Sequence, residues 1–143
     1  LKDHGVPVAL LDRAYALAEA LFALPEASKL RHRSGLRGYT PFGTEHAKDH
    51  RVPDLKEFWQ VGRDPAAARA VGAAQDDVDA LPPNVWPAEL PEFRATFEAL
   101  FAALDETGRT LLEALAPGLG LPPTYFDPLV RDGGRPVPMR DAL

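Results

Sequence analysis

The feature that most constrains the fold is a long amphipathic segment that follows Leu90 and runs to a break at Pro117. Its large apolar residues recur every three or four positions, which is the spacing of one helix face. Pro91 suits the first helical turn, where its missing N–H costs nothing, and Glu92 favours the positive end of the helix dipole. About 25 residues at 1.5 Å each make a rod of roughly 40 Å, which needs a partner surface. The apolar face consists of Phe93, Phe97, Leu100, Phe101, Leu104, Leu111, Leu112 and Leu115, with Gly108 among them.

Two shorter helices are predicted nearer the N-terminus. Within 8–24 the apolar residues lie three or four apart, which predicts an amphipathic helix with one broad buried face. Pro7 fits the first turn of that helix, and Pro25 ends it because the residue before a proline avoids the helical region. A second helix is predicted over 26–32, with Gly35 as its stop.

The pattern changes after the second helix. Gly38 and Tyr39 predict a turn, and the aromatic and branched run at 56–61, bounded by a proline and a glycine, predicts a strand. Residues 65–80 are rich in alanine and acidic residues, which indicates a helical segment. Residues 122–130 carry two aromatic side chains and are predicted to fold back on the long helix.

Composition narrows the class of protein. The 143 residues fit one domain, and 45% hydrophobic with 26% charged residues is close to the globular average. The net charge of −5 and the scattered Lys and Arg residues form no basic stripe, so we expect no nucleic-acid partner. No run approaches the ~18 apolar residues of a membrane span, so we expect no membrane partner either. The absence of cysteine excludes thiolate chemistry and fits a reducing compartment, and we expect a cytoplasmic protein.

One cluster of potential metal ligands occurs, at residues 45–50. On a helix, His46 and His50 would share a face and could bind a divalent metal. Pro41 and Pro53 predict a loop instead, where a four-residue spacing fixes no common face. We therefore predict a solvated polar loop at this position.

Other polar residues have structural interpretations. His4 precedes a glycine turn, where a histidine is more often a hydrogen-bonding group than a catalyst. The neighbouring carboxylates of Asp76, Asp77 and Asp79 predict a solvated face. The sequence contains no Gly-rich phosphate loop and no Gly-x-Ser-x-Gly motif, so the residues alone indicate no independent catalytic mechanism.

Five short motifs in a fixed order are more specific than these patterns. They are HGVP at 4–7, FALP at 22–25, GYTPFGTEHAKD at 38–49, DLKEFW at 54–59 and LGLPPTYFD at 119–127. In this order they resemble the N-terminal region of the isopenicillin-N-synthase-like, non-haem iron, 2-oxoglutarate-dependent oxygenases. The first motif departs from the family pattern, since Asp3 stands in place of an Asn.

The resemblance implies an α+β fold that is mainly helical. The chain would be the N-terminal helical part, with a few strands, of a jelly-roll (double-stranded β-helix) oxygenase whose barrel core is largely absent here. Residues 1–130 would form this N-terminal region, and residues 131–143 an irregular tail. Residues 1–5 resemble the end of an apolar strand that begins upstream. The partner of this region would be the missing C-terminal half of the barrel.

The resemblance also implies where the chemistry lies. Family enzymes bind Fe(II) through His-x-Asp and a later His, and hold 2-oxoglutarate through Arg-x-Ser. None of the four histidines starts a His-x-Asp or His-x-Glu, and no Arg-x-Ser occurs. We therefore expect no catalytic residue, no metal ligand and no bound cofactor in this chain. The complete oxidoreductase would use Fe(II) and 2-oxoglutarate to hydroxylate, desaturate or ring-close a small organic substrate, and this chain alone would be inactive.

Substrate contact is the one direct role that the resemblance gives to residues of this chain. In relatives, the strand that follows an acidic pair points alternate side chains toward the pocket mouth, which nominates Phe58 and Gln60. Tyr39 and Arg37 are further candidates, because the Gly-Tyr turn lies near the site entrance. Ordinary packing is an equal alternative for Phe58 and Trp59. For the whole chain the alternative is a stand-alone helical interaction module that acts through exposed apolar faces.

Overall fold

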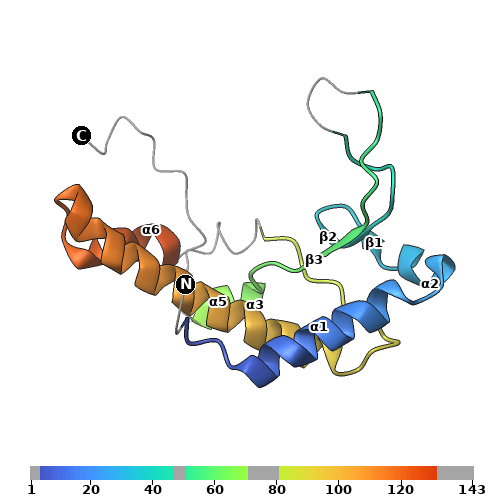
Figure 1. Ribbon diagram of the computed structural model, residues 1–143, viewed down its shortest axis with the longest axis horizontal. Helices are drawn as coiled ribbons and strands as arrows, with labels where there is room; N and C mark the ends of the chain where they lie inside the picture. The colour runs from blue at the N-terminus through green and yellow to red at the C-terminus, as the bar shows by residue number, and fades with distance from the viewer. Residues whose placement is uncertain (1–3, 47–50, 71–80, 132–143) are drawn as a thin grey trace.

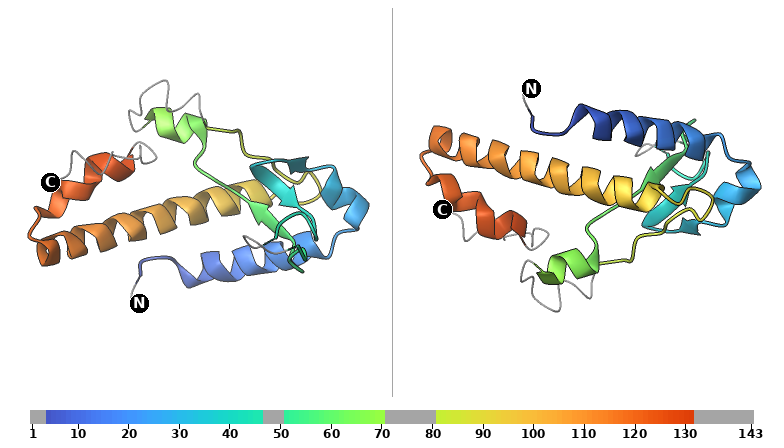
Figure 2. Two further views of the ribbon diagram at one scale, coloured as in Figure 1. Left: turned by 90° about the horizontal axis from the view of Figure 1, so that it is seen from above. Right: turned by 90° about the horizontal axis from the view of Figure 1, so that it is seen from below.

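The computed structural model describes residues 4–46, 51–70 and 81–131 (Figure 1). Two helices dominate this part, α1 (Val8–Phe22) and α5 (Phe93–Leu115). They run antiparallel and side by side, and a small sheet lies across one end of the pair (Figure 2). The described part is therefore mixed helix and strand with helix predominating, as the sequence predicts.

Both long helices are confirmed, and proline and glycine set their ends. Pro7 has an extended backbone (φ −60°, ψ 133°) that leads into α1, and Ala23 caps the other end. The 23 residues of α5 continue into a short 3-10 helix, η1 (Ala116–Leu119). Gly120 closes η1 at φ 74°, a left-handed conformation that glycine adopts without steric cost.

Three short antiparallel strands form the sheet. Their order is β1 (Arg33–Ser34), β2 (Arg37–Thr40) and β3 (Phe58–Gln60). The predicted strand at 56–61 is confirmed as β3. Across the β2–β3 pair, Gly38 faces Gln60, Tyr39 faces Trp59 and Thr40 faces Phe58.

The predicted second helix is confirmed as α2 (Glu26–Leu30), which ends shortly before His32. Two predictions near the first strands are wrong. Gly35 (φ 60°) lies in the β1–β2 hairpin instead of stopping the helix. Gly38 and Tyr39 lie inside β2 and do not form a turn. Gly38 has φ 73°, and an added Cβ would overlap the His32 carbonyl oxygen. The glycine thus permits a close approach of two backbone segments within the hairpin.

The C-terminal elements pack on the long helix. Two short helices, η2 (Pro123–Phe126) and α6 (Asp127–Arg131), contact α5. This confirms that residues 122–130 fold back on it. After β3, α3 (Pro65–Ala70) confirms the start of the predicted helical segment.

Some predictions fall on residues that the structure does not describe. Residues 71–80, with Asp76, Asp77 and Asp79, and residues 132–143, nearly all of the predicted tail, lie outside the described part. So do residues 47–50, which include His50. Within the described ranges, no helix combines the length and the apolarity that crossing a membrane requires.

The core sits where the sheet meets the helix pair. Leu21, Tyr39 and Phe93 are its largest fully buried side chains. The Phe93 ring stacks on Phe97 with 4.1 Å between centroids and meets Trp59 edge-on at 5.7 Å. Such aromatic pairs add about 0.5–1.5 kcal/mol beyond area burial. The core therefore joins α1, β2, β3 and the first turns of α5.

Candidate functional site

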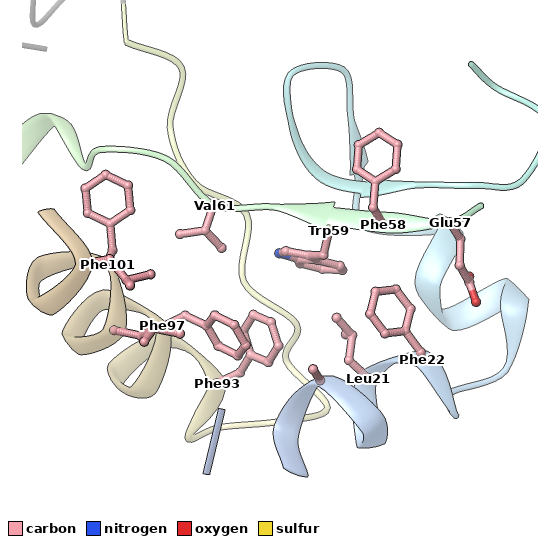
Figure 3. A pocket seen from close by; sticks show the side chains of 12 residues that line it. Leu21, Phe22, Glu57, Phe58, Trp59, Val61, Phe93, Phe97 and Phe101 are labelled. Carbon is pink, nitrogen blue, oxygen red and sulfur yellow. The ribbon is translucent and has the colours of Figure 1, made fainter. Parts of the chain in front are cut away.

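An apolar hollow of about 500 Å³ opens between α1, β3 and the first half of α5 (Figure 3). We name it the aromatic cradle. Among the described residues that line it, Glu57 is the one ionisable side chain. The lining consists of Ala18, Leu21, Phe22, Glu57, Phe58, Trp59, Val61, Phe93, Phe97, Leu100, Phe101 and Leu104.

The strand β3 presents two different faces. Side chains alternate along a strand, and in Figure 3 Glu57, Trp59 and Val61 point toward the helices while the Phe58 ring points the other way. Trp59 and its cross-strand neighbour Tyr39 share the inner face. Most of the strand's contribution to the cradle therefore comes from the inner face, and Phe58, although it borders the cradle, directs its ring to the outer face.

Phe58 and Gln60 lie together on the outer face of the sheet. Gln60 is exposed and Phe58 is half-buried. The Lys56 ammonium lies 5.4 Å from the centroid of the Phe58 ring, and Glu45 (2.9 Å) and Asp54 (3.3 Å) hold that ammonium in place. The structure therefore brings these two predicted residues together beside a charged cluster.

Tyr39 lies on the opposite side from that pair. It is only 1% exposed, and its hydroxyl donates to Glu57 Oε2 at 2.5 Å. Burial, and then the hydrogen bond and negative charge of Glu57, raise the pKa of Tyr39 above its ordinary value. In the described structure its hydroxyl is therefore engaged by Glu57.

Sequence reasoning missed the partner of that phenol, a buried ion pair between Lys29 and Glu57. Lys29 Nζ donates to Glu57 Oε2 at 2.7 Å and to the Phe22 carbonyl oxygen at 3.1 Å. The side chains are 8% and 15% exposed. Burial alone would raise the pKa of Glu57, but the hydrogen bonds from Lys29 and Tyr39 outweigh it and the pKa is lowered. A signal existed, since Glu57 shares a strand face with two apolar residues and an inward carboxylate needs a partner.

Arg37, the fourth predicted residue, is half-buried on β2. Its guanidinium lies against Gly62, where an added Cβ would overlap it, and Nη1 donates to the Leu36 carbonyl oxygen at 3.1 Å. Nε is covered and has no hydrogen-bond partner within the described part of the chain. Among the residues that the structure describes, no carboxylate forms an ion pair with Arg37. The four predicted site residues are thus not gathered in one pocket.

Two side chains fix the backbone around the cradle. Gly62 lies two residues after the end of β3. The Asn84 side chain accepts from the Gly62 N–H and donates to the Gly62 carbonyl oxygen, both at 2.9 Å. His4 Nδ1 accepts from the Val6 N–H at 3.2 Å, and the His4 carbonyl oxygen accepts from Thr107 Oγ1 at 2.8 Å. His4 therefore has the structural hydrogen bond that the sequence predicts for it.

Charged residues in the described part of the segment between β2 and β3 contact one another. Glu45 pairs with Lys56, and its carbonyl oxygen accepts from the Asp54 N–H at 2.8 Å. His46 is exposed. In the described ranges, no group of three or more His, Cys, Asp or Glu side chains is arranged to hold a metal ion. The described residues therefore do not fit an iron site.

The described part is thus a pair of long helices with an open aromatic cradle between them and a short sheet across one end. The chain belongs to the family of N-terminal regions described as "non-haem dioxygenase in morphine synthesis N-terminal", whose model matches residues 1–89. This confirms the resemblance that the motifs indicate. The chain is 32% identical over 134 residues to the 2-oxoglutarate-dependent dioxygenase caaD of Aspergillus niger, covering 89% of this chain and 39% of that relative.

Solved structures agree on fold and family. A putative 2OG-Fe(II) oxygenase family protein from Caulobacter crescentus matches with a TM-score of 0.75 and 39% identity, over 90% of this chain and 41% of that one. A full-length Neurospora crassa protein, solved in complex with alpha-KG, matches with a TM-score of 0.67 and 25% identity, over 90% of this chain and 39% of that one. The chain therefore spans about two-fifths of the length of the relatives it matches.

Proposed function

We propose that this chain is the N-terminal scaffold of an Fe(II)- and 2-oxoglutarate-dependent oxygenase and supplies one wall of its substrate pocket. Relatives carry dioxygenase or oxygenase names, and a structural neighbour was solved with alpha-KG, which is 2-oxoglutarate. The complete enzyme would hydroxylate, desaturate or ring-close a small organic molecule in the cytoplasm. Residues 1–130 form the scaffold in this proposal, and residues 131–143 an irregular tail.

The observation that carries the proposal is the open aromatic cradle. Its lining is almost entirely apolar, and the apolar surface continues onto Leu11 and Tyr15 through a neighbouring groove of about 340 Å³. The indole Nε1 of Trp59 is covered yet has no hydrogen-bond acceptor among the described residues. A jelly-roll barrel packed on the cradle would cover the apolar side chains and could bring an acceptor to Trp59. The long helix α5 would then support one sheet of that barrel.

The proposed pocket wall is the outer face of the sheet. Phe58 offers an aromatic surface and Gln60 an exposed amide on the same side of β3. Arg37 would add to the edge of the wall through its guanidinium, which lies against Gly62 just beyond β3. Tyr39 contributes from behind, because its hydroxyl bonds Glu57 on the inner face. The small-molecule substrate would lie against this outer face, on the side of the sheet opposite the cradle.

Iron and cosubstrate belong to the barrel in this proposal, so the chain alone is inactive. The test is anaerobic isothermal titration of the 143-residue chain with Fe(II), with 2-oxoglutarate and with both. We expect no stoichiometric binding, whereas a longer protein that includes the barrel should bind both. Tight binding by this chain would show that it has its own metal site and would refute its role as a scaffold.

The second candidate function is a stand-alone helical interaction module. It is favoured by the large apolar side chains that remain exposed, among them Tyr15 at 76% and Leu104 at 53%. The DNA downstream of the segment encoding this chain separates the two. An in-frame or frame-shifted His-x-Asp segment would support the oxygenase scaffold, and its absence would favour the module.

A further inference from the structure

The buried cluster of Lys29, Glu57 and Tyr39 joins four separate elements. Lys29 comes from α2, Tyr39 from β2 and Glu57 from the residue before β3, and the Phe22 carbonyl oxygen ends α1. Three hydrogen bonds of 2.5–3.1 Å connect them, and the Lys29 ammonium also lies 5.4 Å from the centroid of the Tyr39 ring. Two of these bonds, one from Lys29 and one from Tyr39, end on the same oxygen, Glu57 Oε2.

We propose that Lys29, Glu57 and Tyr39 are positioning residues that fix the register and tilt of β3, and thereby hold Phe58 and Gln60 on the substrate side of the sheet. The substrate role of Phe58 and Gln60 rests on the function proposed above. The anchoring of β3 does not.

The geometry explains why an anchor is needed here. β3 has only three residues, and its ladder to β2 pairs just three positions. A slip of one residue would move the strand by about 3.3 Å and turn every side chain to the other face. Phe58 and Gln60 would then point into the cradle, while Trp59 and Val61 would point outward. With only three paired positions, the ladder by itself opposes such a slip weakly, and the inward side chains must add to it.

Glu57 opposes the slip because its carboxylate strongly prefers the inner face of the sheet. Its carboxylate has two donors on the inner face, whereas the outer face at this position offers the exposed Lys56 cluster. A buried carboxylate that loses its partners is costly, because the remaining charge stays desolvated. At the other end of β3, the two hydrogen bonds of Asn84 hold Gly62. The strand is therefore fixed at both ends, and Glu57 sets the face at its start.

The test measures the position of β3 in this chain directly. The sequence has no cysteine, so Ala16→Cys on α1 and Gln60→Cys on β3, both at exposed positions, give two unique sites for spin labels. Double electron–electron resonance then reports the distance distribution between helix and strand. We expect one narrow distribution in the parent, and a shifted or broadened one in Lys29→Met and in Glu57→Gln.

The matched control is Glu106→Gln, which removes the same charge from an exposed ion pair with Arg109 on α5. It should leave the distance distribution unchanged. A variant that is merely less stable loses folded molecules but keeps the distance in those that remain. An unchanged distribution in folded Lys29→Met and Glu57→Gln would therefore overturn the proposal.

If Lys29→Met does not fold, Tyr39→Phe decides, since it removes one hydroxyl and leaves the ion pair. Broadening in Tyr39→Phe supports the anchor, and an unchanged distribution refutes it. These results do not depend on iron or 2-oxoglutarate. If the distance measurements contradict the anchor, the proposed oxygenase scaffold is therefore unaffected. If the longer protein does not bind Fe(II) and 2-oxoglutarate, the proposed anchor is unaffected.

Discussion

At the residue scale, three glycines differ in what surrounds the missing Cβ. At Gly38 an added Cβ would overlap a backbone oxygen of His32, and φ is 73°. At Gly62 it would overlap the guanidinium of Arg37, which is the end of a flexible side chain. At Gly108 it would meet nothing within 4 Å. The same substitution should therefore have three different outcomes.

We predict that Gly38→Ala is the most destabilising of the three alanine variants and that Gly108→Ala stabilises the chain. An alanine in an unobstructed helix interior gains about 0.5–1 kcal/mol over glycine. Gly62→Ala should cost on the order of 1 kcal/mol, because Arg37 can move aside. Urea unfolding of each variant measures these changes. The cost of Gly62→Ala should fall in an Arg37→Ala background, and an equal cost in both backgrounds would contradict the contact.

Glu57 should make the folding stability of the chain depend on pH in the acid range. Its pKa is lowered in the folded state from the ordinary value of 4.5, because the bonds from Lys29 and Tyr39 outweigh burial. A lowered carboxylate pKa stabilises the fold above the ordinary value and loses that effect as the pH falls through the folded value. We predict that Glu57→Gln is less stable than the parent at pH 7 and has a flatter stability curve below pH 4.5.

Urea unfolding at a series of pH values checks this prediction. The control is Glu98→Gln, which removes an exposed pair with Arg94 and should change stability little at neutral pH. Parallel acid limbs for the parent and Glu57→Gln would show that Glu57 does not carry the dependence.

At the scale of elements, the start of α1 is tied to the middle of α5. Thr107 Oγ1 lies 2.8 Å from both the His4 and the Ala103 carbonyl oxygens, so it can serve the turn before α1 as well as its own helix. Thr110 Oγ1 contacts only the Glu106 carbonyl oxygen, at 3.0 Å, within α5. The two threonines are a natural pair for comparison.

We predict that Thr107→Val destabilises the chain by about 0.5–1.5 kcal/mol, the net worth of a typical hydrogen bond. Thr110→Val should cost less, because it breaks no contact between elements. Urea unfolding gives the energies, and amide exchange at Val6 reports the turn before α1. Equal effects of the two substitutions would mean that the His4 contact contributes nothing.

The elements also show what sequence can and cannot predict. The bounds of α1 and α5 follow from spacing and from nearby prolines, which are local signals. The β1–β2 hairpin was missed because its strands are short and its pairing depends on a close approach at Gly38. The Lys29–Glu57 pair joins residues 28 positions apart, and no local pattern specifies that distance. Phe58 and Gln60 were placed on one face by strand alternation, and the structure confirms that face but does not test their role.

At the scale of the whole molecule, the apolar faces of α1 and α5 are only partly covered. The sequence predicts one broad buried face on α1, yet Val8 is 70% and Tyr15 76% exposed. Phe93 at the start of α5 is 1% exposed, whereas Leu104 further along is 53% exposed. If the barrel of the proposed function packs on the cradle, it would cover the apolar side chains that this chain leaves exposed.

This difference along α5 yields the last prediction. Leu104→Ala should cost less than about 1 kcal/mol in this chain, because a half-exposed leucine has little burial to lose. If the barrel of the proposed function is present in a longer protein, the same change there should cost about 2–5 kcal/mol, as expected for a buried leucine. Phe93→Ala is the control, since it should be damaging in both. Thermal and urea unfolding of the four variants would measure the contrast. A small effect of Leu104→Ala in both proteins would mean that the barrel leaves this face free, which is the arrangement that an interaction module requires.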